Sequence, residues 1–429
     1  CGAQAFLSDT VPNPVLMRVA SLVLAPWLLA QCGAALRIGR DIVRDNKTKP
    51  PWLKHADSFV VDLDLPPMDR WKNLTLRYRE TLPTLLSLLS KHTLGLNSDG
   101  LNRSYLTYYN NIPGEYMAEL VGIAKWANHS DVTLERLIWW NLMYEMAFPY
   151  ACSGIVAADK NGMVIHSRNL DADLSWNVGG RRISFEDITV DITYVKGGEP
   201  LFNNIAFIFQ IGAHTGMALR SNKSRSWSLQ QDTRFTNEYS KNLEAAKAGG
   251  KPYSFFVRAL MENRNLDFKG AVTEITRAKI VAPCYFIVAG GGPWEGAVIA
   301  LDRATHARTL NNVQVLSKAI GRWFIVQTND DLWFDSIDNR RPRGVDWMHQ
   351  LGQENVNVEN IVVTMRTSPL FNPGTLLTYT TIPSQGFHRT VMASESLLAM
   401  SLSRTQVALR GSKQLIAPTL GRDEWWLGQ

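Results

Sequence analysis

The spacing of apolar residues divides the chain into a helical first part and a strand-rich second part. Residues 36–65 are polar with scattered prolines, and they predict an extended linker that ends in a strand. Between residues 69 and 148 apolar positions recur at helical spacing, with helix starts expected near residues 114 and 131. Residues 134–148 are apolar on most sides, which favours a helix packed against its neighbours over one that touches lipid.

Beyond residue 151 the pattern changes to short runs rich in Val, Ile, Tyr and Phe, broken by Gly, Asn and Asp, as is typical of strands. The predicted strands are 153–158, 163–169, 188–194, 204–209, 285–289, 298–301 and 323–328, with helical stretches near 236–247, 254–265 and 268–280. The tail beyond residue 384 carries no functional signal. The sequence therefore predicts an α+β protein whose helical region ends next to Cys152.

Composition excludes some classes of function. The chain is 45% hydrophobic and 20% charged, which is ordinary for a globular protein. Its net charge of +6 is spread along the sequence without a run of like charges, and no zinc-finger or RNA-binding motif occurs. These features argue against a nucleic-acid partner, and diffuse basic charge suits an anionic membrane surface about as well.

The longest apolar run, residues 19–30, is shorter than the ~20 residues that span a bilayer. Met17 and Arg18 precede the run and small residues follow it, which is the pattern of a signal peptide. We expect Met17 to be the true start and residues 1–35 to be removed as a leader; a short buried helix is the alternative. Five sequons fit a glycosylated luminal protein, namely Asn46, Asn73, Asn102, Asn128 and Asn222.

Four cysteines occur, and loss of the leader would leave only Cys152 and Cys284. Two cysteines in a secreted chain of this size do not make a disulfide scaffold. Cys284 leads into an apolar run and is interpreted as core packing. Cys152 would be a free thiol in the oxidising secretory pathway, where an unpaired thiol is a liability, which suggests that it has a chemical role.

A hairpin brings chemistry-bearing residues close to Cys152. Asn161-Gly162 is typical of a two-residue type I′ turn, which would place Cys152 opposite Asp171, with Arg168 within ~10 Å. Alternation puts Arg168 and Asp171 on opposite faces of a regular strand, so we expect Asp171 to lie past the strand end and to bend back.

This group of residues suggests an N-terminal nucleophile. A thiol has an ordinary pKa near ~8.5 and needs a base, and a freed α-amine at residue 152 has an ordinary pKa of ~7.7–8.0. Arg168 would ionise the thiol, and Asp171 would hold the amine. Two alternatives stay open at this point: a buried structural cysteine, and a thiol enzyme that pairs Cys152 with His166 or His214.

Residues 152–157 (CSGIVA) and 168–171 (RNLD) resemble the acid ceramidase and N-acylethanolamine-hydrolysing acid amidase family of N-terminal-nucleophile hydrolases. Further matching segments occur in order between residues 50 and 381, namely 63–67, 70–71, 141–145, 280–283, 285–287, 321–323, 326–329 and 339–341. The resemblance implies an αββα N-terminal-nucleophile sandwich preceded by a mostly helical region. It also implies self-cleavage between Ala151 and Cys152.

By this resemblance Arg168 and Asp171 organise the Cys152 nucleophile, Asn329 stabilises the oxyanion, and Arg340 is the family arginine near the site. One oxyanion donor can stabilise the transition state by ~2.7–4 kcal/mol. The resemblance implies no cofactor and no metal. It implies an N-acyl lipid substrate presented at membranes, a heterodimer of α and β subunits, a saposin-like activator, and a lysosomal or secreted location.

The implied organisation is a leader (1–35), a helical α-subunit (36–151), a catalytic β-subunit (152–383) and a tail of unknown role (384–429). No cysteine matches the family's bridge between subunits, so packing alone is expected to hold them together. Ceramide is the favoured substrate, with fatty acid ethanolamides as the alternative.

Two positions depart from the family pattern. Thr233 stands where the family carries glutamate, with Asp232 before it as a possible substitute, and Asp330 stands where the family usually carries tyrosine. These departures motivate a further alternative, a lipid-binding glycoprotein that has lost catalysis.

Overall fold

The computed structural model describes residues 56–86, 107–148, 150–172, 175–178, 181–304, 313–336 and 338–393. The predicted leader, the sequons Asn46 and Asn102, and the tail beyond residue 393 lie outside these ranges. No helix in the described ranges is long and apolar enough to cross a membrane.

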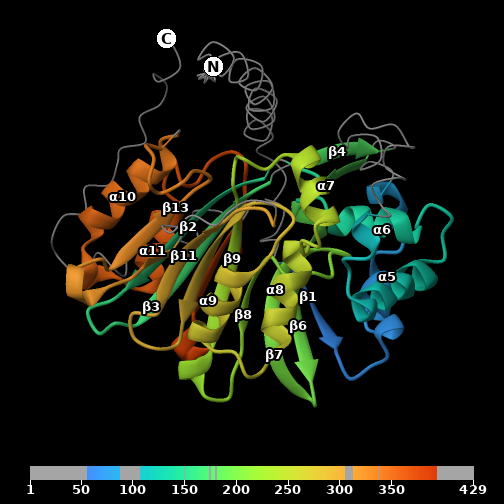
Figure 1. Cartoon of the computed structure of the whole chain (residues 1–429), viewed down its shortest axis with the longest axis horizontal. Coiled ribbons are helices and arrows are strands. Elements are labelled where there is room, and N and C mark those ends of the chain that lie inside the picture. The colour runs from blue at the N-terminus through green and yellow to red at the C-terminus, as the bar shows by residue number, and fades with distance from the viewer. Residues whose placement is uncertain are drawn as a thin grey trace, which may run out of the picture.

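Two β-sheets form the centre of the molecule (Figure 1). The larger sheet contains, in spatial order, β1 (Asp57–Asp62), β6 (Thr189–Lys196), β7 (Glu199–Phe207), β8 (Thr215–Ala218), β9 (Trp227–Thr233), β10 (Cys284–Gly290), β11 (Gly296–Leu301) and β12 (Val313–Val315). The smaller sheet contains β13 (Phe324–Gln327), β2 (Ala151–Ala158), β3 (Val164–Asp171), β14 (Thr375–Ile382) and β15 (Phe387–Met392). A separate hairpin joins β4 (Ser175–Val178) to β5 (Arg181–Ser184).

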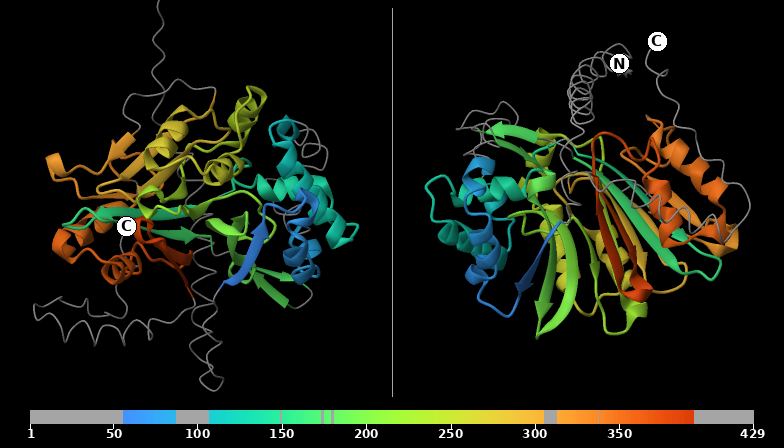
Figure 2. Two further views of the ribbon diagram at one scale, coloured as in Figure 1. Left: turned by 90° about the horizontal axis from the view of Figure 1, so that it is seen from below. Right: turned by 180° about the vertical axis from the view of Figure 1, so that it is seen from behind.

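Helices cover the outer faces of both sheets (Figure 2). Helices α8 (Tyr253–Glu262) and α9 (Phe268–Arg277) pack on the larger sheet, and α10 (Arg340–Leu351) and α11 (Val358–Met365) pack on the smaller one. Other helices in the described ranges include α2 (Lys72–Arg77), α5 (Gly114–Ala127), α6 (Leu134–Asn141) and α7 (Tyr239–Lys247). Strands β2 and β3 contact β9 and β10 of the facing sheet, so the predicted αββα sandwich is confirmed.

Strand β2 is buried on both faces, because one face meets the larger sheet and the other meets α10 and α11. Val156 belongs to the apolar cluster between the sheets, whereas Ile155 and Ala157 belong to the cluster beneath α10 and α11. Side chains alternate along a strand, so Cys152 shares the face of Val156. Burial on both faces explains the nearly continuous apolar sequence of this strand.

The hairpin between β2 and β3 differs from the predicted two-residue turn. Ala158 pairs with Val164, and the Asp159 N–H donates to the Met163 carbonyl at 2.9 Å, which leaves a three-residue loop. Gly162 closes this loop with a φ of 89°, a conformation that suits glycine. Cys152 therefore pairs with Leu170, and the predicted pairing with Asp171 was wrong by one residue.

The region before Cys152 contains the strand predicted near residue 65 as well as helices. Strand β1 pairs in parallel with β6 and so joins the larger sheet. Helix α6 ends at Asn141 instead of continuing to residue 148, and its Trp140 is buried and donates from Nε1 to the Ile208 carbonyl at 2.6 Å. This helix packs against its neighbours, as we favoured, and not against lipid.

Most of the predicted strands and all three predicted later helices occur within a few residues of their expected positions. Strands β4, β5, β8, β9, β12, β14 and β15 were not predicted. Strand β15 pairs with β14, so the smaller sheet continues past residue 383, where the catalytic region was expected to end.

Candidate active site

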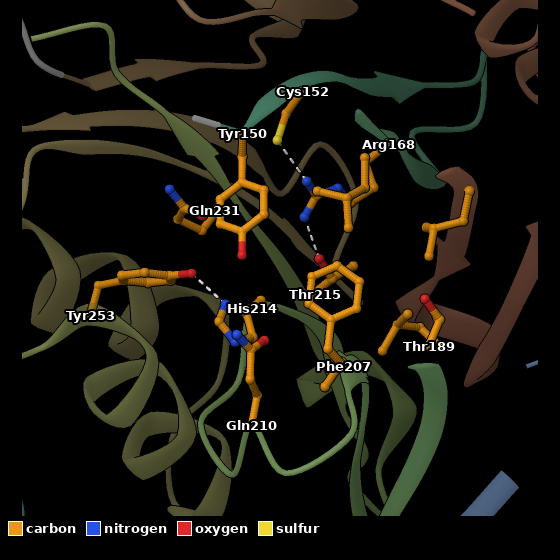
Figure 3. A pocket seen from close by; sticks show the side chains of 14 residues that line it. Tyr150, Cys152, Arg168, Thr189, Phe207, Gln210, His214, Thr215, Gln231 and Tyr253 are labelled. Carbon is orange, nitrogen blue, oxygen red and sulfur yellow. Dashed lines mark hydrogen bonds between the residues drawn. The ribbon is translucent and has the colours of Figure 1, made fainter. Parts of the chain in front are cut away.

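Cys152 lies between the two sheets and is in direct contact with Arg168 (Figure 3). Its thiol is 1% exposed, and the Arg168 Nη2 donates to Sγ at 2.8 Å. Gly154 on β2 pairs with Arg168 on β3, so the guanidinium and the thiol point to the same face of the sheet. Thr215 of β8 holds the guanidinium through a hydrogen bond from Nη1 to its Oγ1.

Asn329 and Arg340 hold the backbone of Cys152. The Cys152 N–H donates to Asn329 Oδ1 at 3.1 Å, and Arg340 Nη2 donates to the same oxygen at 2.8 Å. Arg340 is the first residue of α10, and its Nη1 donates to the Cys152 carbonyl at 2.8 Å. The Asn329 Nδ2 donates to the Thr233 carbonyl at 2.8 Å. Both the oxygen and the nitrogen of the Asn329 side-chain amide are therefore hydrogen-bonded in the uncut chain.

Asp171 contributes to the site through Arg340. It is the last residue of β3 and does not lie past the strand end, and it points to the face opposite Arg168, as alternation required. It accepts hydrogen bonds from Thr375 Oγ1 at 2.7 Å, Asn372 Nδ2 at 3.0 Å and Arg340 Nη1 at 3.2 Å. The carboxylate therefore orients the arginine that contacts residue 152. All five predicted catalytic residues thus come together, on β2, β3, the loop after β13 and the start of α10.

Burial dominates the electrostatics of the nucleophile. It raises the pKa of the Cys152 thiol to about 12, although Arg168 and the backbone N–H of Thr233 favour the thiolate. Burial also raises the pKa of Asp171, against the opposing effect of Arg340. The thiol of the continuous chain is therefore protonated at neutral and acidic pH.

Sequence reasoning missed the contribution of β9. Thr233 ends this strand, and its backbone N–H lowers the pKa of the Cys152 thiol, while Asp232 is fully buried with Oδ1 3.9 Å from Arg168 Nη2. Strand β9 has the sequence WSLQQDT, and because most of its residues are polar, it lacks the apolar run that predicts a strand. A buried strand with four consecutive polar residues could have been recognised only from its partners.

A pocket of about 490 Å³, partly open to solvent, leads to Cys152 and Arg168. Its apolar lining comes from Leu170, Ile205, Ala206, Phe207 and Leu377, and its polar lining from Thr189, Gln210, His214, Thr215, Gln231 and Tyr253. Tyr150, two residues before Cys152, also lines the pocket, and Figure 3 shows its ring pointing inward between Cys152 and His214. The segment before residue 152 thus occupies part of this space.

Neither candidate histidine contacts the thiol. His166 shares the face of Arg168, as expected, but its ring nitrogens bond to Ser228 Oγ at 2.9 Å and Gln230 Oε1 at 2.8 Å. His214 Nδ1 bonds to Tyr253. Burial lowers the pKa of His166 to about 4 and that of His214 to about 3, so both rings are neutral.

The other predicted residues lie at the surface or away from the thiol. Asn73, Asn128 and Asn222 are exposed, as glycan acceptors must be. Asp330 anchors its own loop by accepting from Thr328 Oγ1 at 2.8 Å and Ser336 Oγ at 2.7 Å. Within the described ranges no group of three or more His, Cys, Asp or Glu residues could hold a metal ion.

A buried ion pair joins the regions before and after Cys152. Arg258 Nη1 and Nη2 on α8 each donate to the Glu119 carboxylate of α5 at 2.6 Å, and both side chains are 0% exposed. Arg70 Nη1 and Trp71 Nε1 donate to the same carboxylate at 2.8 and 2.6 Å. The non-covalent contacts between these regions therefore include a buried ion pair as well as apolar packing.

Comparison with known proteins gives consistent relatives. No family model matches the chain. It is 30% identical to acid ceramidase of Macaca fascicularis over 346 residues, which cover 77% of this chain and 84% of that protein. It is 30% identical to human acid ceramidase over 349 residues (77% and 82%), and 27% identical to the N-acylethanolamine-hydrolyzing acid amidase of Caenorhabditis elegans over 341 residues (76% and 88%).

A solved structure of a Caenorhabditis elegans N-acylethanolamine-hydrolyzing acid amidase ortholog aligns with a TM-score of 0.47 at 28% identity, covering 54% of this chain and 93% of that one. The identity to the macaque and human proteins extends over most of each relative's length. The chain therefore belongs to the acid ceramidase and N-acylethanolamine-hydrolysing acid amidase family of amide hydrolases.

Proposed function

We propose that this chain is a precursor that cuts itself before Cys152 and then uses Cys152 as an N-terminal nucleophile to hydrolyse the amide bond of N-acyl lipids. One observation carries the proposal: Arg168 contacts the thiol of residue 152 at 2.8 Å, while Asn329 holds the nitrogen of the same residue at 3.1 Å. Both reactive atoms of a single residue are therefore held in place.

The first step is the self-cleavage. Sγ adds to the Ala151 carbonyl carbon, the bond from that carbon to the Cys152 nitrogen breaks, and a thioester forms. Water hydrolyses the thioester and leaves a carboxylate on Ala151 and a free amine and thiol on Cys152. Arg340 supports this step because it holds the Cys152 carbonyl at 2.8 Å and so fixes the chain on the leaving side.

The second step is hydrolysis of the substrate. The free α-amine, with an ordinary pKa of ~7.7–8.0, takes the thiol proton, and Sγ attacks the substrate carbonyl. The amine then returns the proton to the leaving lipid amine, and water releases the fatty acid from the thioester. The Thr233 N–H, which already faces the thiol, would stabilise the oxyanion. Asn329 would join it once its Nδ2 leaves the Thr233 carbonyl.

The pocket supports an acyl chain as the substrate group. Leu170, Ile205, Phe207 and Leu377 give it apolar walls next to the nucleophile, as burial of a hydrocarbon chain requires. Tyr150 belongs to the segment that ends at the cut, so the cleavage would free this segment to leave the pocket. Opening of the pocket would also hydrate Cys152 and lower its pKa.

An exposed aromatic group beside the site supports substrate presented at a membrane. Phe235, Trp333 and Phe334 are 52%, 41% and 66% exposed. Arg234 lies 5.8 Å from the Trp333 ring, and the Phe235 N–H donates to the Asn329 carbonyl at 3.3 Å. Aromatic rings with adjacent arginine suit the interface of an anionic bilayer. The exposed sequons and the signal-like leader support a lysosomal or secreted glycoprotein. Substrate presented at a membrane is compatible with a saposin-like activator.

Ceramide is the substrate we favour, because residues 65–67, 175–177 and 326–329 resemble ceramidase. The chain is also 30% identical to proteins named acid ceramidase. A fatty acid ethanolamide is the second candidate, because Cys152 and Cys284 are both free thiols and give no bridge between α and β subunits. The Glu119–Arg258 ion pair would hold those subunits together instead.

The test is to follow the purified chain on a reducing gel after incubation between pH 4.5 and 8, beside Cys152→Ala. Wild type should yield two pieces, the larger one beginning Cys-Ser-Gly-Ile, and Cys152→Ala should stay intact. The ratio of kcat/KM for ceramide and palmitoylethanolamide then decides between the two substrates. An active wild type that remains a single chain would refute the mechanism, and an intact chain that binds N-acyl lipids without turnover would establish the non-catalytic alternative.

A further inference from the structure

The proposed self-cleavage requires a proton donor for the nitrogen of Cys152. As the bond to Ala151 breaks, this nitrogen must gain a proton to leave as an amine. In the uncut chain the Cys152 nitrogen is an amide, which is not basic, and its single hydrogen is donated to Asn329 Oδ1. Both buried histidines are neutral and bonded elsewhere. The donor must therefore be another group within reach of the Cys152 side chain and nitrogen.

Asp232 is a buried carboxyl group that meets the same arginine as the thiol. It is 0% exposed on β9, and its Oδ1 lies 3.9 Å from Arg168 Nη2, the nitrogen that donates to Cys152 Sγ at 2.8 Å. Gly154 leaves room for the Gln230 side chain, which a Cβ there would meet at 2.4 Å and which donates to Asp232. The carboxyl group and the thiol thus lie beside one guanidinium nitrogen, so Asp232 Oδ1 and Cys152 Sγ are at most about 7 Å apart, a gap that water can bridge for proton transfer.

A directed series of hydrogen bonds ends on Asp232. Gln230 Nε2 donates to Asp232 Oδ1 at 2.7 Å, so Gln230 Oε1 must accept from His166 Nε2 at 2.8 Å. His166 then carries its proton on Nε2, and its Nδ1 accepts from Ser228 Oγ at 2.9 Å, which in turn accepts from Thr381 Oγ1 at 2.9 Å. Every donor points toward the carboxyl group. Oδ1 is fixed as an acceptor, and a proton on Asp232 must sit on Oδ2.

The second oxygen is available for proton transfer. Asp232 Oδ2 is buried and has no hydrogen-bond partner within the described ranges. Burial raises the pKa of Asp232 to about 7, so the carboxyl group is protonated under acidic conditions. The titratable and charged groups around it are Arg168, Asp171 and His166 on β3, Cys152 on β2, Arg340 on α10 and Cys284 on β10. The arginines lower the pKa of Asp232, and Asp171 raises it.

We propose that Asp232 is the general acid of the self-cleavage. Its Oδ2–H gives its proton to the Cys152 nitrogen as the carbon–nitrogen bond breaks. The carboxylate so formed takes the proton that Sγ loses on forming the thioester, which restores the acid. The proposal rests on the proposed self-cleavage and adds a catalytic residue to it.

This role differs from that of the glutamate that the family carries at position 233. Successive residues of a strand point to opposite faces, so the Asp232 side chain cannot occupy the place of a side chain at residue 233. The substitution considered from the sequence, a carboxylate displaced by one residue, therefore does not describe Asp232. Once the α-amine is free it carries its own protons, so Asp232 is required for the first cut.

The test follows the rate of self-cleavage of the full chain between pH 4.5 and 8.5 for wild type, Asp232→Asn, Asp232→Glu and Asp191→Asn. Asp191 is the control, a partly buried strand carboxyl group whose pKa is likewise raised by burial and which does not line the pocket. Wild type and Asp191→Asn should cleave fastest below pH 6 and slow about tenfold per pH unit above about 7. Asp232→Asn should be at least ~100-fold slower at pH 5 with a flat profile, and Asp232→Glu should regain the pH dependence. Thermal unfolding confirms that each variant is folded.

Two results would overturn the inference while leaving the proposed function intact: cleavage of folded Asp232→Asn at the wild-type rate, or a wild-type rate that rises with pH. Failure of the proposed function looks different, because wild type would then stay intact at every pH, as Cys152→Ala does.

Discussion

The free energy of unfolding should change less between pH 4.5 and pH 8 when Glu145 is replaced with glutamine, by about 3 kcal/mol. Glu145 follows α6 and is 0% exposed. Its Oε1 accepts from the Tyr253 N–H at 2.8 Å, and its Oε2 has no partner in the described part of the chain. Burial raises the pKa of Glu145 from 4.5 to about 7. One pKa unit corresponds to about 1.4 kcal/mol, so the full rise corresponds to about 3.5 kcal/mol, of which about 3 kcal/mol lies between pH 4.5 and pH 8.

The sign follows from which state binds the proton more tightly. The pKa is raised on folding, so the folded chain holds the proton more tightly than the unfolded chain does. The contribution to stability is complete below pH 4.5 and is lost as the pH rises through about 7. This carboxyl group therefore favours the folded chain under acidic conditions. Asp232 acts in the same direction, because burial also raises its pKa to about 7.

The assay is urea unfolding followed by tryptophan fluorescence at pH 4.5 and pH 8. All variants carry Cys152→Ala, so that self-cleavage does not complicate the transition. The free energy of unfolding of this parent should fall between the two pH values, and the fall should be about 3 kcal/mol smaller with Glu145→Gln. Glu274→Gln, at an exposed helical position, is the matched control and should behave as the parent does. An equal fall in the parent and in Glu145→Gln would refute the reasoning.

Three further predictions concern the site and its support. Arg168→Lys should slow self-cleavage at least ~100-fold on a reducing gel, because a single ammonium cannot contact the thiol and Thr215 together. Glu119→Gln should cost about 3–5 kcal/mol of unfolding free energy by leaving Arg258 buried without its full partner, and it should release the two pieces of the cut protein in size-exclusion chromatography. Trp333→Ala should lower hydrolysis of N-acyl lipid in anionic vesicles more than hydrolysis of a short-chain soluble substrate; an equal loss would contradict membrane docking.

The elements that could be predicted from the sequence are those in which apolar residues dominate. Strands β2 and β10 are nearly continuous apolar runs, and α9 has a clear periodic pattern. Strands β9 and β14 read WSLQQDT and TLLTYTTI and are fully buried nevertheless. Their polar side chains bond across the interior, as Thr378 Oγ1 does to Asn169 Oδ1 at 2.7 Å, so no apolar alternation marks them.

The candidate site shows the same limit. The five predicted catalytic residues were expected from the hairpin and from the family resemblance, but their supporting groups depend on contacts between distant segments. Glu119 and Arg258 are 139 positions apart, and no feature of either local sequence indicates that they pair. In the sequence, Asp232 was noted only because it precedes Thr233, which departs from the family pattern. The packing of β9 against β2 and β3 brings it close to Arg168. Long-range pairing of buried charges therefore needs the structure.

The length of one loop determines which charge faces the thiol. A two-residue turn at Asn161-Gly162 would pair Cys152 with Asp171 and place the thiol and a carboxylate on one face, where the carboxylate would raise the thiol pKa further. The three-residue loop shifts the pairing by one, so that Cys152 shares its face with Arg168 and Asp171 turns to Arg340 on the other side. A type I′ turn needs a positive φ at both Asn161 and Gly162, and of these two residues only Gly162 has one, so the three-residue loop decides that a cation and not an anion contacts the nucleophile.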